Sequence, residues 1–585
     1  MIKLAIVVMV CAWAGTAQSA PNPPYHPIDP RASDQTIVLD GHALSIDQVI
    51  QVARFGAKVT LTAEARQRSA DAFALLLEAA AEGIPVYWFN RGVGASRETV
   101  IFRGDPLSSE NQKFLEARQL AVFKRGALAG LGPEINQEEV VRAMLLVRAN
   151  TMSFEAASPQ LTQRLLDLLN ERITPVVYSR GTIGEGDLAP LANVAATMVG
   201  AGTVYFQGER MPASEALTRA GLKPLAPFGA DDSALESSNA YATAQAALML
   251  YDAQEALRWA DLLYAVDLNG MNSSVTSLSQ PVQANRPFKW LNWDAARVLD
   301  IVKGSYLFEL DRARIIQDPE SLRASSIRAG AAWQAFAQLR EVTLLQMNSS
   351  DHNPAVRVGA GPADSWELST PQLAQFYVRG SPRNHGQHGF VLSNANWDPY
   401  PLANEIESFT LALANLDVAI AQRILRFTNP LFTASEHVDD SPGEPGRFHL
   451  TQGSELDAIA LMQEIQGLTN PVAPQGVGMI QNVEDLQSES RLKVDRARSA
   501  VDDTLELLAE DLLTGTYWLD RRKLQQPSRR FGGPTEALWT AFRGTLPMDG
   551  GDRSRGSLPI HEIAASFIRS NPAGQFYRET LKEPE

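Results

Sequence analysis

Cysteine is almost absent from the sequence: Cys11 is the only one in 585 residues. It lies in an N-terminal stretch, 1–19, that combines a lysine, a short apolar run and small residues before Ala20, which is the pattern of a secretory signal. Removal of this stretch leaves no thiol, and so excludes disulfides, a cysteine nucleophile and thiolate metal ligands. We therefore expect a periplasmic or secreted protein without covalent cross-links.

Long apolar runs and basic clusters are missing as well. The apolar part of the signal-like stretch is too short to cross a bilayer, and no later segment approaches the length of a membrane span. The formal net charge is −15 and the charges are scattered, which argues against nucleic acid as a partner. We find no P-loop, nucleophile elbow or internal repeat.

Histidine is scarce, with eight in the chain. His385 and His388 are three residues apart and are the best candidates for metal ligands, but no nearby carboxylate pattern completes a ligand set. The sequence therefore predicts no metal site.

What the sequence does contain is helical periodicity. Strands with turns are expected at 36–44 and 85–94, and helices at 62–81, 140–153, 233–266 and 400–427. Leu250, Leu257 and Tyr264 mark the buried stripe of the third helix, and Phe409, Leu413 and Ile420 that of the fourth. Less regular chain is expected over 350–396, 429–453 and beyond about Gly515. The pattern predicts a mostly helical protein.

A glycine-rich turn stands out at 180–191. Three glycines precede Asp187, which suits a helix N-cap, and Pro190 suits the first turn of the helix that follows. Such a turn can hold an anion where backbone donors meet a helix N-terminus. On its own it is equally well an ordinary capped loop.

This turn resembles a known signature. Residues 181–191 read Gly-Thr-Ile-Gly-Glu-Gly-Asp-Leu-Ala-Pro-Leu. The histidine and aromatic amino acid ammonia-lyases have Gly-Ser-Val-Gly-Ala-Ser-Gly-Asp-Leu-Ala-Pro-Leu, whose Ala-Ser-Gly triplet cyclises into an electrophilic methylidene-imidazolone. Here one residue is missing and Glu185 replaces the serine. Glutamate has no hydroxyl to lose as water, so we expect a divergent family member with no cofactor.

Further motifs of that family follow in order. Residues 85–94 resemble Tyr-Gly-Ile-Asn-Thr-Gly-Phe-Gly and place Tyr87 on a catalytic acid–base. Residues 314–323 resemble Val-Gln-Asp-Pro-Tyr-Ser-Leu-Arg, keeping Gln317 and the carboxylate-binding Arg323, while Glu320 replaces a second tyrosine. The histidine that histidine ammonia-lyases carry near 123–128 is absent.

Four more residues complete the expected site. Asn239 falls on an active-site asparagine of the family. Residues 394–398 stand in place of Gly-Gly-Asn-Phe-His, retaining Asn396 and an aromatic ring at Trp397. Residues 481–488 place Glu484 on the family's active-site glutamate.

The resemblance covers about 45–513. It implies a mainly α fold, ammonia-lyase/fumarase-like, with a long antiparallel helix-bundle core and a small α/β N-terminal part. It also implies a homotetramer whose active sites take residues from neighbouring subunits. We divide the chain into the signal 1–19, an N-terminal part 20–230, a helical-bundle core 231–515 and a C-terminal region 516–585.

The altered motif positions leave four functions open. Glu185, Glu320 and Glu484 would crowd a pocket that keeps Tyr87 and Arg323, and such crowding separates acid from base roles. The first function is cofactor-free elimination of a good leaving group, and the second is isomerisation or cyclisation. In both, the substrate would be a small anionic, aromatic or unsaturated metabolite. The third is ligand binding without catalysis, and the fourth is ordinary ammonia elimination.

Overall fold

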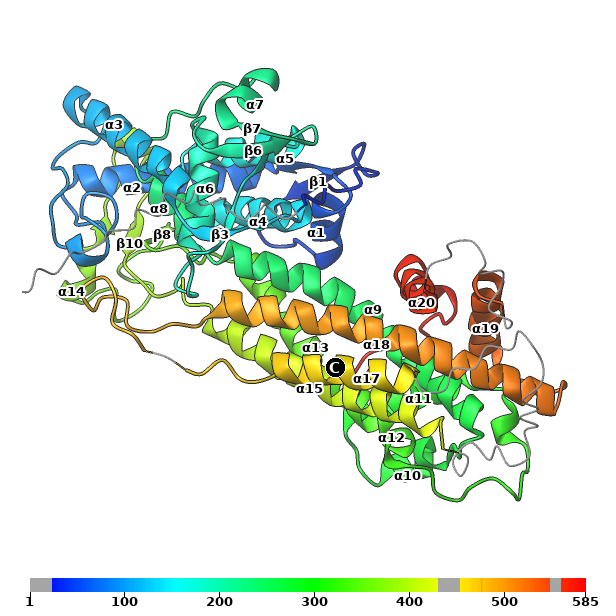
Figure 1. Cartoon of the computed structure of the whole chain (residues 1–585). Coiled ribbons are helices and arrows are strands. Elements are labelled where there is room, and N and C mark those ends of the chain that lie inside the picture. The colour runs from blue at the N-terminus through cyan, green and yellow to red at the C-terminus, as the bar shows by residue number, and fades with distance from the viewer. Residues whose placement is uncertain (1–23, 430–452, 475, 548–558, 585) are drawn as a thin grey trace, which may run out of the picture.

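A helical bundle forms the larger part of the protein in the computed structural model (Figure 1). The structure describes residues 24–429, 453–474, 476–547 and 559–584, so the predicted signal and most of the predicted loop 429–453 lie outside the described residues. The bundle lies at one end of the molecule and a mixed α/β part at the other, and one helix, α9, enters both (Figure 1). The predicted fold class is confirmed.

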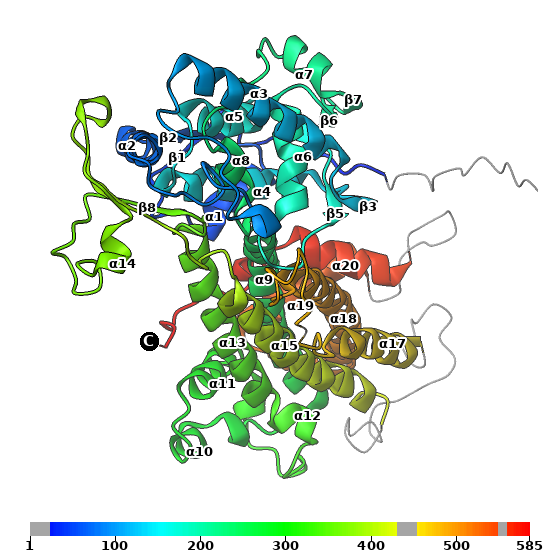
Figure 2. The same cartoon turned by 90° about the vertical axis from the view of Figure 1, so that its left-hand side faces the viewer.

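Four long helices make the bundle core. Helix α9 packs along α18, α18 along α15 and α15 along α13, as Figure 2 shows from the side. The stripes predicted on α9 and α15 are buried. The helices of the bundle are α9 (Ala240–Met271), α10 (Gln280–Ala284), α11 (Lys289–Ile301), α12 (Glu320–Arg323), α13 (Ser325–Met347), α15 (Tyr400–Arg426), α17 (Gly453–Leu468) and α18 (Ser490–Gln525).

Helix α15 corrects one expectation. Among the described residues it is the one helix that is long and apolar enough to cross a membrane, although we expected no such segment after the signal. Its apolar residues pack against α13 and α18, and 61% of the most apolar window is buried inside the protein. Its hydropathy is therefore explained by the bundle core.

The N-terminal part combines short sheets with helices. Strand β1 (Thr36–Leu39) pairs in parallel with β2 (Lys58–Leu61), and between them Ser45 forms a capping box for α1 (Ile46–Ala53). The other elements are α2 (Ala63–Ala81), α3 (Ser109–Arg125), β3 (Leu131–Glu134), α4 (Glu138–Thr151), α5 (Pro159–Asn170), β4 (Thr174–Pro175), β5 (Tyr178–Arg180), α6 (Leu188–Met198), β6 (Thr203–Phe206), β7 (Glu209–Pro212) and α7 (Ala213–Arg219).

The predicted strand at 85–94 is wrong: this segment is a series of turns. Trp88 has φ +56°, outside the extended region. The Asn90 side chain holds the turn closed, since its Nδ2 donates to the carbonyl of Ile84 at 2.8 Å and its Oδ1 accepts from the amide of Val86 at 2.8 Å. A local side-chain bond has replaced strand pairing.

The predicted helix 233–266 is two helices, α8 (Asp231–Glu236) and α9. The chain breaks at 237–239 because distant carboxylates cap the second helix. Asp351 accepts from the amide of Asn239 at 2.7 Å, and Asp187 accepts from the amides of Tyr241 and Ala242 at 2.9 and 3.1 Å. These bonds satisfy the orphan donors of a helix start, which the local sequence did not reveal.

Two segments expected to be irregular contain regular structure. Beyond Gly515, helix α18 continues to Gln525, and α19 (Gly533–Thr545) and α20 (Ile560–Ser570) follow, with Leu538, Phe542 and Phe567 buried. Within 350–396, β8 (Ala355–Val358), β9 (Tyr377–Val378) and β10 (Gly389–Leu392) form an antiparallel sheet in the order β8-β10-β9, and α14 (Pro371–Ala374) lies between two of them.

Arg423 links four helices of the bundle. From α15 it bonds Asp267 of α9, Asp511 of α18 at 2.9 Å and the hydroxyl of Ser325 of α13 at 2.8 Å. All of these residues are buried. Removing the guanidinium would leave two carboxylates buried together without a cation.

We predict that Arg423→Met lowers the free energy of unfolding by about 3–5 kcal/mol, the cost of breaking a buried ion pair from one side. Denaturant unfolding followed by circular dichroism measures this. Arg328→Met is the matched control, because Arg328 is an exposed arginine of α13 that contacts Asn415. Equal stability of the two variants would contradict the assigned role of Arg423.

Candidate functional site

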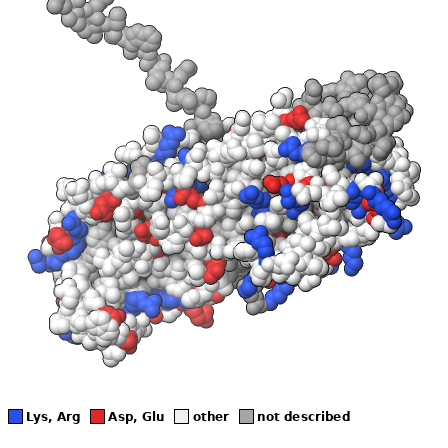
Figure 3. Space-filling view, turned by 90° about the horizontal axis from the view of Figure 1, so that it is seen from below, with Lys and Arg blue, Asp and Glu red and all other residues white. Residues whose placement is uncertain are grey.

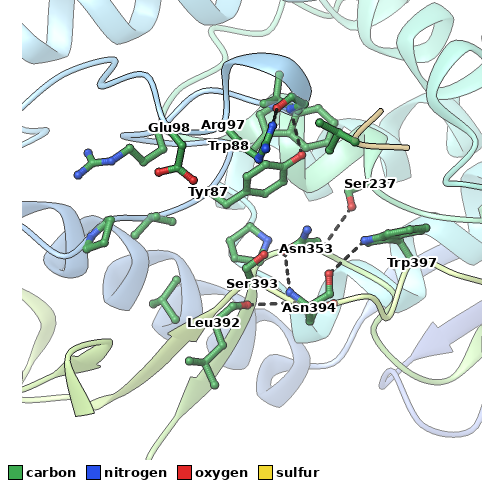
Figure 4. A pocket seen from close by; sticks show the side chains of 18 of the residues that line it. Tyr87, Trp88, Arg97, Glu98, Ser237, Asn353, Leu392, Ser393, Asn394 and Trp397 are labelled. Atoms are coloured by element: carbon green, nitrogen blue, oxygen red, sulfur yellow. Dashed lines mark hydrogen bonds between the residues drawn. The ribbon is translucent and has the colours of Figure 1, made fainter. Parts of the chain in front are cut away.

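A cavity of about 700 Å³ lies where the N-terminal part meets the bundle. Its walls come from separate segments: the turns at 85–98, the glycine loop, the 391–397 loop after β10, and the 480–484 loop before α18. Leu373 and Phe376, near α14, form a further apolar wall. Figure 4 shows the side chains that surround the cavity.

The glycine loop packs tightly against the chain that precedes α18. The Ser488 hydroxyl donates to the carbonyl of Gly184 at 2.9 Å, and the amide of Glu489 donates to the carbonyl of Ile183 at 2.8 Å. A Cβ on Gly184, which has φ +88°, would lie 2.0 Å from the Ser488 hydroxyl. Only glycine fits this approach, which places Glu185 beside the loop that carries Glu484.

Asp187 corrects the prediction of a simple helix cap. It occupies the N-cap position of α6, yet its carboxylate makes no cap bond to that helix. Instead it accepts from the first turn of α9 and from the Thr182 hydroxyl at 3.0 Å. The glycine loop is thus fastened to the start of the bundle.

Asn239 joins the glycine loop to the 394–397 loop. Its Oδ1 accepts from the amide of Gly186 at 3.2 Å, and its Nδ2 donates to the carbonyl of Trp397. Trp397 lines the cavity and donates its indole N–H to the carbonyl of Asn394 at 3.1 Å (Figure 4). Asn396, predicted to bind substrate, is exposed and does not line the cavity.

Glu185 is the most unusual group in the cavity. Both of its carboxylate oxygens are buried and have no hydrogen-bond partner among the described residues. Burial, followed by the negative charges of Asp398, Glu484 and Asp485, raises its pKa to about 8. Burial and Asp485 also raise the pKa of Glu484. At neutral pH Glu185 is therefore mainly protonated and able to donate a proton.

Tyr87 shares this cavity with Glu185 and Glu484. Its hydroxyl accepts from the amide of Gly94 at 3.3 Å. Burial and the charge of Glu484 raise its pKa, while the Gly94 N–H and Arg97 act in the opposite direction. The structure thus brings together three of the four predicted catalytic groups.

Gln317, Glu320 and Arg323 lie elsewhere in this chain. They belong to the α12 region, at the end of the bundle away from the cavity (Figures 1 and 2). The Glu320 side chain is 86% exposed and pairs with Arg323 at 3.3 Å, and Arg323 also donates to the carbonyl of Asp318. A single chain does not bring them to Tyr87, so their predicted roles require a second copy.

Sequence reasoning missed several cavity residues. Some of them could have been found from the sequence, because they differ from the family within a motif that otherwise matches. Trp88 and Arg91 stand where the family motif at 85–94 has glycine and threonine. Others lie in segments that match no motif of the family, so the sequence did not indicate them. The missed residues are Trp88, Arg91, Arg97, Glu98, Glu236, Leu373, Phe376 and Ile480.

The family's prosthetic group does not fit these residues. The position of its triplet holds Gly184, Glu185 and Gly186, none of which has a hydroxyl to eliminate. The nearest hydroxyl in the loop, that of Thr182, is buried and donates to the carbonyl of Gly186 at 3.1 Å and to Asp187. These residues therefore cannot form a methylidene-imidazolone by loss of water from the triplet position.

Comparisons with known proteins agree with the fold. The sequence profile of the aromatic amino acid lyase family matches residues 44–544. Histidine ammonia-lyase of Treponema denticola is 26% identical over 501 residues, covering 85% of this chain and 90% of that protein. Histidine ammonia-lyase of Symbiobacterium thermophilum is 29% identical over 523 residues, covering 89% and 94%.

Solved structures show the same architecture. The ergothioneine-degrading enzyme ergothionase of Treponema denticola, in complex with desmethyl-ergothioneine sulfonic acid, has a TM-score of 0.77 and 25% identity, covering 93% of this chain and all of that one. Tyrosine aminomutase of Streptomyces globisporus has a TM-score of 0.76 at 22% identity, covering 94% of this chain and all of that one. The chain belongs to the aromatic amino acid lyase family.

Proposed function

We propose that the protein is a lyase that eliminates an amine by acid–base chemistry alone, from a substrate whose amine is already a good leaving group. The observation that carries this proposal is Glu185, a buried carboxyl with a raised pKa and no hydrogen-bond partner among the described residues, at the position of the family's electrophile. Acid–base help contributes about 10²–10⁴ in rate. Enzymes in general need about 10⁶ or more, so unactivated ammonia would leave too slowly.

The cavity supports a quaternary ammonium as the leaving group. Aromatic rings of Tyr87, Trp88 and Trp397 line it together with the carboxyl groups of Glu185 and Glu484. Aromatic faces and carboxylates are the groups that recognise alkylated ammonium ions. Ergothioneine, which the ergothionase degrades, carries a trimethylammonium group next to a carboxylate. We infer a betaine, an α-trimethylammonium carboxylate with an aromatic or unsaturated side chain, as the substrate class.

The proposed elimination needs only groups in the cavity. The Tyr87 phenolate takes a proton from the carbon β to the carboxylate, and the C–H electron pair becomes the new C=C bond. The C–N pair leaves with nitrogen as neutral trimethylamine. Glu185 then donates its proton to the departed amine. The electrophile of the family makes ammonia a better leaving group. A permanent positive charge on nitrogen has the same effect here, because the amine then leaves as a neutral molecule.

We predict that the purified protein releases trimethylamine from one or more members of a panel of aromatic and imidazole betaines, ergothioneine included. L-Histidine, L-phenylalanine and L-tyrosine should give no urocanate or cinnamate-type absorbance. Tyr87→Phe should abolish turnover and Glu185→Gln should lower it, because Glu185 acts only after the C–N bond has broken, whereas Tyr400→Phe, at an exposed tyrosine, should leave turnover unchanged.

Each other outcome points to a different function. Urocanate or cinnamate from a free amino acid would identify an ordinary ammonia-lyase. A rearranged or cyclised product without amine release would identify an isomerase or cyclase. Betaine binding without any product would identify a ligand-binding protein.

Export and the missing prosthetic group are tested by one measurement. We predict that intact mass spectrometry of protein from the periplasm or medium gives the mass of the chain beginning at Ala20. The reasons are the signal pattern in 1–19 and the lack of a hydroxyl residue at 184–186. A further loss of two water molecules would contradict the second claim, and recovery only in the cytoplasm with Met1 present would contradict the first.

We also propose that Arg323 binds the substrate carboxylate in the cavity of another copy within a homotetramer. Basic side chains gather on the bundle end of the face in Figure 3, which complements the acidic cavity. Arg323→Ala should weaken betaine binding by about 1.5–3 kcal/mol, the value of a charge-assisted hydrogen bond, as measured by calorimetry. Arg328→Ala is the control, because Arg328 is an exposed arginine of α13 that contacts Asn415. Unchanged affinity in a folded Arg323→Ala tetramer, or a monomer that binds fully, would refute this role.

A further inference from the structure

The Tyr87 hydroxyl faces an obstacle to acting as a base. It must lose its proton inside a cavity whose carboxyl groups disfavour a second negative charge. Glu484 approaches from the 480–484 loop, and Glu185 and Glu236 line other walls. Burial and Glu484 both raise the pKa of Tyr87. Something in the cavity has to favour the phenolate.

Two groups in the loop that follows Tyr87, the Gly94 amide and Arg97, favour the phenolate. The amide of Gly94 donates to the Tyr87 hydroxyl at 3.3 Å, and the carbonyl of the same residue accepts from Nη1 of Arg97 at 3.5 Å. Figure 4 shows both bonds as dashed lines, with Arg97 beside the Tyr87 ring. Gly94 thus connects a guanidinium to the phenol.

The position of Gly94 is fixed by its surroundings. The residue is buried, has φ +53°, and a Cβ on it would lie 2.8 Å from Cγ2 of Ile480. Glycine therefore brings this loop close to the 480–484 loop, and its N–H stays aimed at Tyr87.

Arg97 is the charged group of this loop that acts on Tyr87. Arg91 and Glu98 also line the cavity, but Arg91 is directed to the carbonyl of Asn90 at 3.3 Å. Arg97 lies at the cavity mouth, exposed to solvent, so its charge is partly screened. The charge and the Gly94 N–H together oppose the effect of Glu484.

We propose that Arg97 is a positioning residue that favours the deprotonated form of Tyr87, through its charge and by holding Gly94 in place at its carbonyl. This rests on the proposed function in one respect, the role of Tyr87 as the base. The effect of Arg97 on the protonation of Tyr87 can be tested in the protein without substrate.

Ultraviolet titration of phenolate absorbance tests the proposal on the full-length protein without substrate. The protein has twelve tyrosines, and subtracting the curve of Tyr87→Phe isolates Tyr87. In Arg97→Gln the midpoint should rise by a few tenths of a pH unit, less than the roughly 1 unit of an unscreened opposite charge, because the charge of Arg97 is partly screened. Arg97→Lys should recover most of the shift. Arg103→Gln, which removes an exposed arginine outside the cavity, should leave the midpoint unchanged.

The same variants are also made with Glu484→Gln, which removes a charge that opposes ionisation and brings the Tyr87 midpoint to lower pH, away from alkaline unfolding. Circular dichroism marks the pH range in which the fold is intact. An Arg97→Gln midpoint equal to that of the parent protein, in both backgrounds, would overturn the proposal. If the shift is found but no betaine is turned over, the proposed function fails while the control of Tyr87 by Arg97 stands.

Discussion

The carboxylate of Asp187 fastens the glycine loop to the start of α9, the helix that runs through both parts of the molecule. Backbone amides at the start of a helix have no partner within it, and those of Tyr241 and Ala242 bond to Asp187. Burial raises the pKa of Asp187 to about 7 even though three donors oppose the rise. The bonds compensate only part of the cost of burial. These bonds hold the glycine loop against α9 and so fix the position of Glu185.

The rest of the cavity depends on the same junction. Asn239, one residue before α9, bonds to Gly186 on one side and to Trp397 on the other. Ser488 closes the loop from the side of α18. Three segments far apart in the sequence therefore meet at one helix start, and each contributes a group to the cavity. The chemistry proposed for Tyr87 and Glu185 relies on this fixed arrangement.

The sequence predicted the fold class and most of the chain that meets at the cavity, because spaced motifs and helical periodicity are both local patterns. It failed where a side-chain hydrogen bond decided the local structure. The break at 237–239 is caused by the distant carboxylates of Asp351 and Asp187, and the turns at 85–94 by the side chain of Asn90 within that segment. The wall made by Leu373 and Phe376 comes from a segment without a motif. The predicted roles of Glu320 and Arg323 depend on packing between copies, which one chain does not specify.

The raised pKa of Glu185 also makes the binding of a simple cation a proton-exchange reaction. A simple cation that enters the cavity stabilises the charged form of this carboxyl, so the pKa falls from about 8 and the proton passes to solvent. A betaine bound as substrate has to leave that proton in place, because Glu185 donates it to the departed amine. Affinity for a cation then increases with pH until the empty cavity is already ionised. The heat of binding includes the heat of protonating the buffer, and its variation from one buffer to another counts the protons released.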